Sequence, residues 1–193
     1  MLTWRDLRAT FVGMRYLLRF RPEGFLFFDP SLRGCLKSFW AALILLPFWW
    51  IALLSEVPQD KIANWDVFVQ IQVASYVINW IFYPILMLPV VRLLHRQERD
   101  CLYISAYNWL QLVQILFVPL LLLMSHFGIP QFLLTVPLHA IFLAYCFFLA
   151  RVGLAVDGQF AFALVFMDFM TGAFADGIAQ NLSGTFAGFG VGM

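Results

Sequence analysis

CLYISAYNWLQLVQILFVPLLLLMSHFGIPQFLLTVPLHAIFLAYCFFLA, residues 101–150, contains no Asp, Glu, Lys or Arg. A transmembrane helix needs about 20 mainly apolar residues to cross ~30 Å of hydrocarbon. The stretch is too long for one crossing, and Gly128 and Pro130 interrupt it near its middle. It therefore predicts two membrane-spanning helices, near residues 102–124 and 132–150.

The composition of the whole chain indicates the same class of protein. Of its 193 residues, 63% are hydrophobic and 12% are charged, and the mean hydropathy is +0.84. Soluble domains are roughly 45–50% apolar and about 25% charged. These values exclude a disordered chain, a nucleic-acid binder and a secreted disulfide scaffold. We expect an all-α, polytopic transmembrane helical bundle.

Three more apolar segments bring the predicted number of spans to five, near residues 36–54, 67–91 and 158–176. The fifth contains Asp168, whose burial in lipid is costly, so a re-entrant or surface-lying segment is the alternative. The predicted organisation is an interfacial segment over residues 1–34, a five-helix bundle over 35–178 and a glycine-rich tail over 179–193.

The basic residues predict the orientation of these spans. All of them except Lys61 fall on one side of the predicted membrane, and Lys61 shares its loop with Glu56, Asp60 and Asp66. Cytoplasmic loops carry the excess of Lys and Arg. The N-terminus is therefore predicted to be cytoplasmic and the C-terminus outside, and we expect a bacterial inner membrane.

Residues 3–20 are predicted to form a basic amphipathic helix that begins with a capping box between Thr3 and Asp6. Its arginines form a stripe expected to bind the headgroups of anionic lipids: Arg5, Arg8, Arg15 and Arg19. The pattern favours an anchor that orients the first span. The alternative is a lipid sensor or a docking surface for a cytoplasmic partner. Asp29 is predicted to cap the next helix, with Pro30 in its first turn.

Several polar residues fall inside the predicted spans, and the costliest is Asp168, ~15 Å from the start of its helix. We expect a polar layer in the bundle interior: Asp168, His139, Asn79, Asn108, Gln111 and Gln114. One interpretation is a proton-coupled or small-solute transporter in which Asp168 titrates and His139 relays protons. The other, which the sparse site favours, is a structural layer whose hydrogen bonds fix helix register.

The sequence offers no catalytic motif, and its histidines have no partner at the spacing of a metal site. No disulfide is expected between Cys35, Cys101 and Cys146, because they fall on the reducing side or in lipid. We therefore expect no enzyme activity and no cofactor, and no nucleic-acid partner. The expected function is a non-enzymatic protein that organises membrane or assembles with partners. Those partners are anionic lipid and either another membrane protein or a second copy of the chain.

The segment YISAYNW at residues 103–109 and the segment RFRP at residues 19–22 resemble the YIP-domain family, the Ypt/Rab-interacting membrane proteins. The resemblance also rests on the cytoplasmic N-terminal region, five closely spaced spans and an outside C-terminus. It implies a non-enzymatic polytopic protein that shapes membrane or recruits partners. It transfers no role to any single residue.

Overall fold

The computed structural model describes residues 2–57, 60, 62–130 and 132–188, and this part of the chain is helical without strands. Five helical runs are long and apolar enough to cross a membrane: Leu32–Ser55, Trp65–Leu93, Gln97–Met124, Phe132–Gly153 and Gly158–Phe186. Each predicted span lies within one of these runs. The all-α bundle of apolar helices is thus confirmed.

The first and third runs are built from shorter helices. The first joins α2 (Leu32–Ser38) to α3 (Trp40–Glu56). The third joins four elements: η3 (Gln97–Arg99), α5 (Asp100–Leu110), η4 (Gln111–Leu116) and α6 (Phe117–His126). The other three runs are single helices: α4 (Trp65–Leu93), α7 (Phe132–Gly153) and α8 (Gly158–Phe186).

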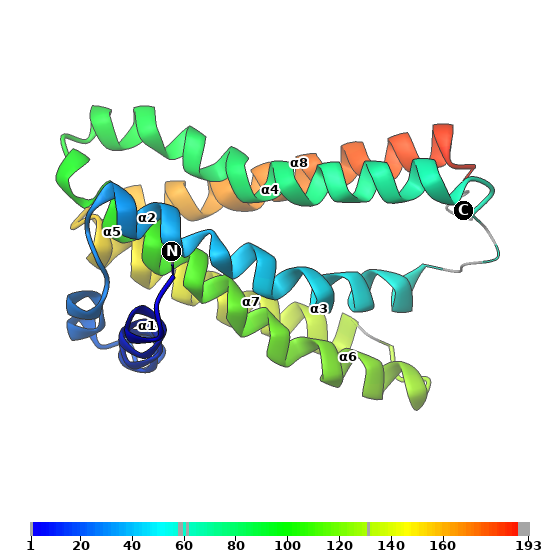
Figure 1. The fold of residues 1–193 in the computed structure, drawn as a ribbon, viewed down its shortest axis with the longest axis horizontal. Coiled ribbons are helices and arrows are strands. Elements are labelled where there is room, and N and C mark those ends of the chain that lie inside the picture. Colours follow the sequence, from blue (N-terminus) through cyan, green and yellow to red (C-terminus); the bar gives the residue numbers. More distant parts are fainter. Residues whose placement is uncertain (1, 58–59, 61, 131, 189–193) are drawn as a thin grey trace.

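Helix α5 lies at one end of the molecule, where α1 and α2 pack against it, and α4 runs beside α8 while α3 runs beside α6 (Figure 1). Every residue from 103 to 110 on α5 is buried, since α1, α2, α4 and α7 all pack around this helix. The hydroxyl groups of Tyr83 on α4 and Tyr103 on α5 form a buried hydrogen bond of 2.7 Å. The aromatic segment near residue 103 is therefore part of the hydrophobic core.

Helix α8 continues to Phe186, ten residues beyond the predicted end of the fifth span. Its small residues Ala179 and Ser183 are buried, and small side chains let two membrane helices approach closely. The carbonyl of Ala187 also accepts hydrogen bonds from the backbone N–H groups of Ala63 and Asn64, at 3.1 Å each. The prediction of a glycine-rich tail from residue 179 is therefore wrong for residues 179–186, which are helical. Lys61 and residues 189–193 lie outside the described residues.

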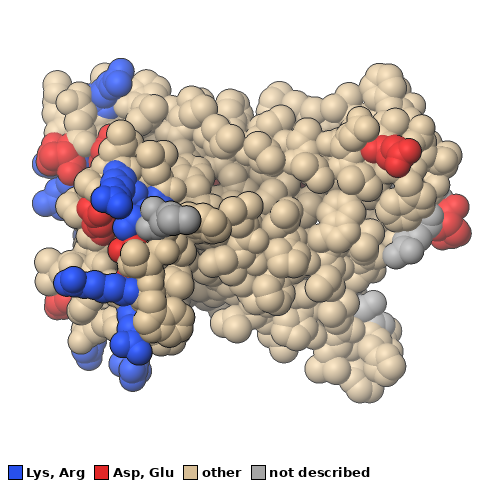
Figure 2. All heavy atoms as spheres, viewed as in Figure 1, with Lys and Arg blue, Asp and Glu red and all other residues tan. Residues whose placement is uncertain are grey.

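The basic residues gather at one end of the visible face of the molecule, whereas acidic residues appear at both ends (Figure 2). The basic end is the one at which α1, α2 and α5 meet (Figure 1). Between the two ends the visible surface carries no Lys, Arg, Asp or Glu over a broad band (Figure 2). A charge-free band between two charged ends is the surface expected of a membrane-spanning bundle.

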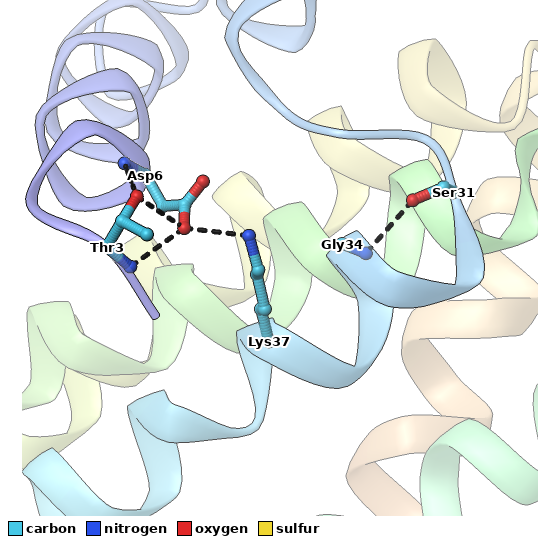
Figure 3. A network of polar contacts seen from close by, with 5 residues as sticks. All are labelled: Thr3, Asp6, Ser31, Gly34 and Lys37. Carbon is cyan, nitrogen blue, oxygen red and sulfur yellow. Dashed lines mark hydrogen bonds and ion pairs between the residues drawn. The ribbon is translucent and has the colours of Figure 1, made fainter. Parts of the chain in front are cut away.

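The amphipathic helix is present as α1 (Trp4–Leu17), and the predicted capping box between Thr3 and Asp6 is confirmed. The same carboxylate accepts a hydrogen bond of 2.7 Å from Nζ of Lys37 on α2, which ties α1 to the first span (Figure 3). The cap of α2 differs from the prediction. Ser31, not Asp29, accepts from the Gly34 N–H, while Asp29 accepts from the backbone N–H of Ser31.

Only one side of α1 packs on the protein. Gly13 and Leu17 are buried against η1 (Pro22–Phe27), whereas Trp4 and Phe11 are 69% and 74% exposed. Part of the predicted apolar face of α1 therefore packs on the protein, and the rest is exposed. Exposed aromatic rings on a basic helix are typical of a helix that lies in the headgroup layer.

The tie between α1 and α2 is expected to weaken in acid. Hydrogen bonds from Lys37 and then Thr3 hold the pKa of Asp6 well below its ordinary value of 3.8. Because the folded-state pKa is the lower one, the stabilisation is complete above pH 3.8 and is lost as the pH falls below it. We expect the protection of α1 amides against hydrogen exchange, taken relative to the intrinsic exchange rate at each pH, to fall below that pH.

Asp6→Asn is the matched variant for this measurement. It removes the carboxylate at every pH, so the protection of its α1 amides should already be low at neutral pH and should change less on acidification. Asp29→Asn serves as a control for the second carboxylate of this region whose pKa is lowered, there by Ser31. Equal acid responses of wild type and Asp6→Asn would contradict the assignment.

Candidate functional site

A polar cavity of about 270 Å³ lies between α3, α4, α5, η4, α7 and α8. Six helical elements supply its polar and aromatic walls: Trp49 from α3; Tyr76, Asn79, Trp80 and Tyr83 from α4; Tyr107 and Asn108 from α5; Gln111 and Gln114 from η4; Phe142 from α7; and Asp168, Thr171, Gly172 and Asp176 from α8. Ligand cavities for drug-sized molecules are about 300–1,000 Å³. This cavity is therefore suited to a small solute.

Two carboxylates of α8 face the cavity. Asp168 and Asp176 are eight residues apart, which places them on one side of the helix about 12 Å apart along its axis. Tyr107 donates a hydrogen bond of 2.7 Å to Oδ1 of Asp168, and Nδ2 of Asn79 donates one of 3.1 Å to Oδ1 of Asp176. Each carboxylate is thus held by a neutral donor from a different helix.

The amide wall is anchored at Asn108, whose side chain is 1% exposed. Its Nδ2 donates to Oγ of Ser38 at 2.8 Å, and Ser38 in turn donates to the carbonyl of Cys35 at 2.6 Å. Within the described part of the chain, Oδ1 of Asn108 has no hydrogen-bond partner. Gln114 donates from Nε2 to Oε1 of Gln111. An unpaired buried acceptor costs about 1–3 kcal/mol, and this oxygen is itself closed to solvent.

Aromatic rings form the opposite wall. The ring centroids of Trp49 and Tyr76 are 4.6 Å apart, and those of Tyr76 and Trp80 are 6.2 Å apart. The rings of Tyr83 and Tyr107 lie 4.8 Å apart. The hydroxyl of Tyr76 donates to the carbonyl of Ala42 at 2.7 Å, which fixes its ring between α3 and α4. The cavity therefore combines rigid aromatic surfaces with hydrogen-bond acceptors.

The structure brings five of the six residues of the predicted polar layer to this cavity: Asp168, Asn79, Asn108, Gln111 and Gln114. His139 is the exception. It lines a neighbouring cavity of about 200 Å³, and its Nδ1 lies 2.7 Å from the Thr135 carbonyl oxygen. The two cavities share Trp49 and Gln114 among their lining residues. His139 therefore adjoins the site, and the hydroxyl that meets Asp168 belongs to Tyr107.

Sequence reasoning missed Asp176 and the tyrosines of α4, although a signal for them exists. Asp168, Thr171, Gly172 and Asp176 follow helical spacing, and so do Tyr76, Asn79, Trp80 and Tyr83. Residues spaced three, four, seven or eight apart share one helix face. A search for polar and aromatic stripes within the apolar spans would have found both walls.

The predicted lipid-binding arginines Arg5, Arg8, Arg15 and Arg19 are all exposed at the basic end of the molecule. The guanidinium carbon of Arg8 lies 5.6 Å from the centre of the Trp4 ring, a cation–π contact. The arrangement leaves the arginine side chains accessible from outside the protein. Contact with lipid headgroups remains a prediction.

The described residues contain no group of three His, Cys, Asp or Glu side chains that would hold a metal ion. The chemistry available in the cavity is binding by charge, by hydrogen-bond acceptance and by aromatic stacking. Comparison of the chain with protein-family models, with curated proteins and with solved structures finds no match.

Proposed function

We propose that this integral membrane protein is a transporter that binds a small polar solute in the cavity between its spans. One observation carries the proposal: two carboxylates and four amides line a single cavity between the membrane-spanning helices. Gly172, the midpoint of α8, also lines it. Ionisable groups inside a membrane bundle mark ion and substrate paths.

The energetics favour binding over a purely structural layer. A charged carboxylate at the centre of a membrane helix costs about 2.5–3.5 kcal/mol on insertion scales. A hydrogen bond between membrane helices returns only ~0.6 kcal/mol on average. Asn79 and Tyr107 therefore offset a part of the cost of Asp176 and Asp168, and amides alone would fix helix register more cheaply. A solute that pairs with the carboxylates accounts for their presence.

The orientation and the membrane belong to the same proposal. The basic end faces the cytoplasm, which places the N-terminus inside the cell and, with five spans, the C-terminus outside. The bacterial inner membrane is the proposed location. The gathering of Lys and Arg at one end supports the orientation (Figure 2).

The cavity offers a matched pair of glycines for testing the proposal. A Cβ atom at Gly172 or at Gly177 meets nothing within 4 Å, but only Gly172 lines the cavity. Gly172→Phe should therefore fill the cavity without a clash at Cβ, and Gly177→Phe should leave it open. We expect Gly172→Phe to lose the flux of any solute that the wild type carries, while Gly177→Phe retains it.

The measurement is uptake into proteoliposomes that contain the full chain, with a panel of radiolabelled amino acids, sugars, amines and inorganic ions. A solute carried by wild type and by Gly177→Phe but not by Gly172→Phe would support the proposal. No flux of any panel member, or equal flux in the two variants, would contradict it.

A second candidate function is the organisation of membrane or the assembly of a complex with a membrane partner or a second copy. The exposed stripe of Arg5, Arg8, Arg15 and Arg19 favours it, because such a face binds anionic headgroups. The resemblance to the YIP-domain family points the same way and stays an expectation. This function requires no open cavity, so it predicts that Gly172→Phe behaves as wild type.

A further inference from the structure

Building on the proposed function, we infer that the solute of the cavity is a small organic ammonium ion. Such an ion pairs a positive charge with an apolar surface. The cavity offers a complement for each: the carboxylates of α8 for the charge and the rings of α3 and α4 for the alkyl groups. The inference narrows the solute from any small polar molecule to one chemical class.

The charges that face the cavity have one sign. Asp168 and Asp176 line it, and its described lining includes no Lys, Arg or His. The ion pair found in the described part of the chain, between Lys37 and Asp6, involves the N-terminal helix and not this cavity. Asp168 is half-buried and Asp176 is exposed, but both lie in a helix long and apolar enough to span a membrane, where an unpaired charge is costly. The carboxylates therefore favour a cationic occupant and disfavour an anionic one.

The hydrogen-bonding groups also suit a donor. Asp168 and Asp176 each accept through Oδ1 from a neighbouring side chain, which leaves Oδ2 for an occupant. The Oδ1 atom of Asn108 has no partner within the described residues but is itself closed to solvent, so the acceptors open to an occupant are those of the carboxylates. The free positions named here are acceptors. The nitrogen of an ammonium ion has no lone pair to accept a hydrogen bond, and its donors are the N–H groups of a primary ammonium ion or the hydroxyl of choline.

The aromatic wall distinguishes an organic cation from a metal ion. A cation over the face of Trp or Tyr within about 6 Å of the ring centre is attracted by the ring quadrupole, and quaternary ammonium ligands are recognised in this way. Trp49, Tyr76 and Trp80 present neighbouring rings, with Tyr83 and Tyr107 as a second pair. Hard metal cations prefer oxygen ligands, and five aromatic rings would contribute little to such a site.

Isothermal titration calorimetry on the full chain in detergent tests the inference with three probes. They are choline, its neutral carbon isostere 3,3-dimethyl-1-butanol, and sodium ion. We expect choline to bind at least about tenfold more tightly than the alcohol, since the two differ mainly in charge, and sodium to bind more weakly than choline.

Tryptophan variants test the aromatic contribution. Trp80→Leu removes a ring of the cavity, whereas Trp65→Leu removes a ring of the same helix that lies outside it. We expect the first to weaken choline binding at least about fivefold and the second to leave it unchanged. Trp49→Leu replaces Trp80→Leu if that variant does not fold.

The outcomes separate this inference from the proposed function. Equal binding of choline and the alcohol, tighter binding of sodium than of choline, or equal effects of Trp80→Leu and Trp65→Leu would each overturn the ammonium assignment. Flux of a neutral solute or an anion that Gly172→Phe blocks would overturn it too and leave the transporter proposal standing. If no solute binds or crosses, both fail.

Discussion

Replacing Asp168 with Asn should weaken ligand binding in the cavity by at least about tenfold and reduce flux in proportion. Asn has the same shape, and its Oδ1 can still accept the hydrogen bond of 2.7 Å from Tyr107, so the local fold is retained. The negative charge is lost. Hydrogen bonds to charged groups are worth about 1.5–3 kcal/mol, and 1.4 kcal/mol corresponds to a tenfold change in affinity.

Titration of choline into wild type and Asp168→Asn measures this effect, with the melting temperature recorded to compare stability. Asp157→Asn is the control, because Asp157 is exposed at the start of α8 and does not line the cavity. It should bind as wild type does. If Asp168→Asn keeps full affinity while Asp157→Asn also does, Asp168 has a structural role only.

The second large effect is expected at Gly24, where η1 meets α1. A Cβ at this position would lie 2.6 Å from the backbone oxygen of Gly13 and 2.7 Å from Cγ of Leu17. The backbone oxygen cannot move without displacing α1. Forcing extra volume into a packed contact costs about 1–3 kcal/mol, so Gly24→Ala should destabilise the N-terminal segment by about this amount.

Gly177→Ala is the opposite case within the same chain. It lies inside α8, and a Cβ there meets nothing within 4 Å. Alanine is favoured over glycine in a helix interior by roughly 0.5–1 kcal/mol, so this variant should be slightly stabilised. Hydrogen exchange in α1 and thermal unfolding in detergent measure both. A Gly24→Ala protein as stable as wild type would contradict this prediction, because it would mean that α1 and η1 can move apart without loss of stability.

The sequence determined the number of spans and their approximate places. A run without charge such as residues 101–150 has one low-energy arrangement in lipid, because backbone groups must bond within the helix. The sequence also predicted the break between the two spans at Gly128. In the structure this residue has a φ of +64°, a conformation that favours glycine. The capping box at Thr3 was readable because its two partners are three residues apart.

Long-range packing decided what local patterns left open. The last turns of α8 are held by α4, where Gln72 donates to Ser183, and by the backbone just before α4, which donates to the carbonyl of Ala187. Glycine content alone suggested a tail there, since glycine disfavours an isolated helix. Ser31 rather than Asp29 caps α2, which reflects the turn geometry between η1 and α2.

The sequence by itself determined that polar residues lie within the apolar spans, because the mean hydropathy of a segment depends only on the residues in that segment. Only the tertiary structure decided which of them meet. The rotation of each helix is set by packing against its neighbours, and it turned Asp168 toward Tyr107 and placed His139 in the next cavity. A pairing across 61 residues depends on the orientation of two helices, which no local pattern specifies.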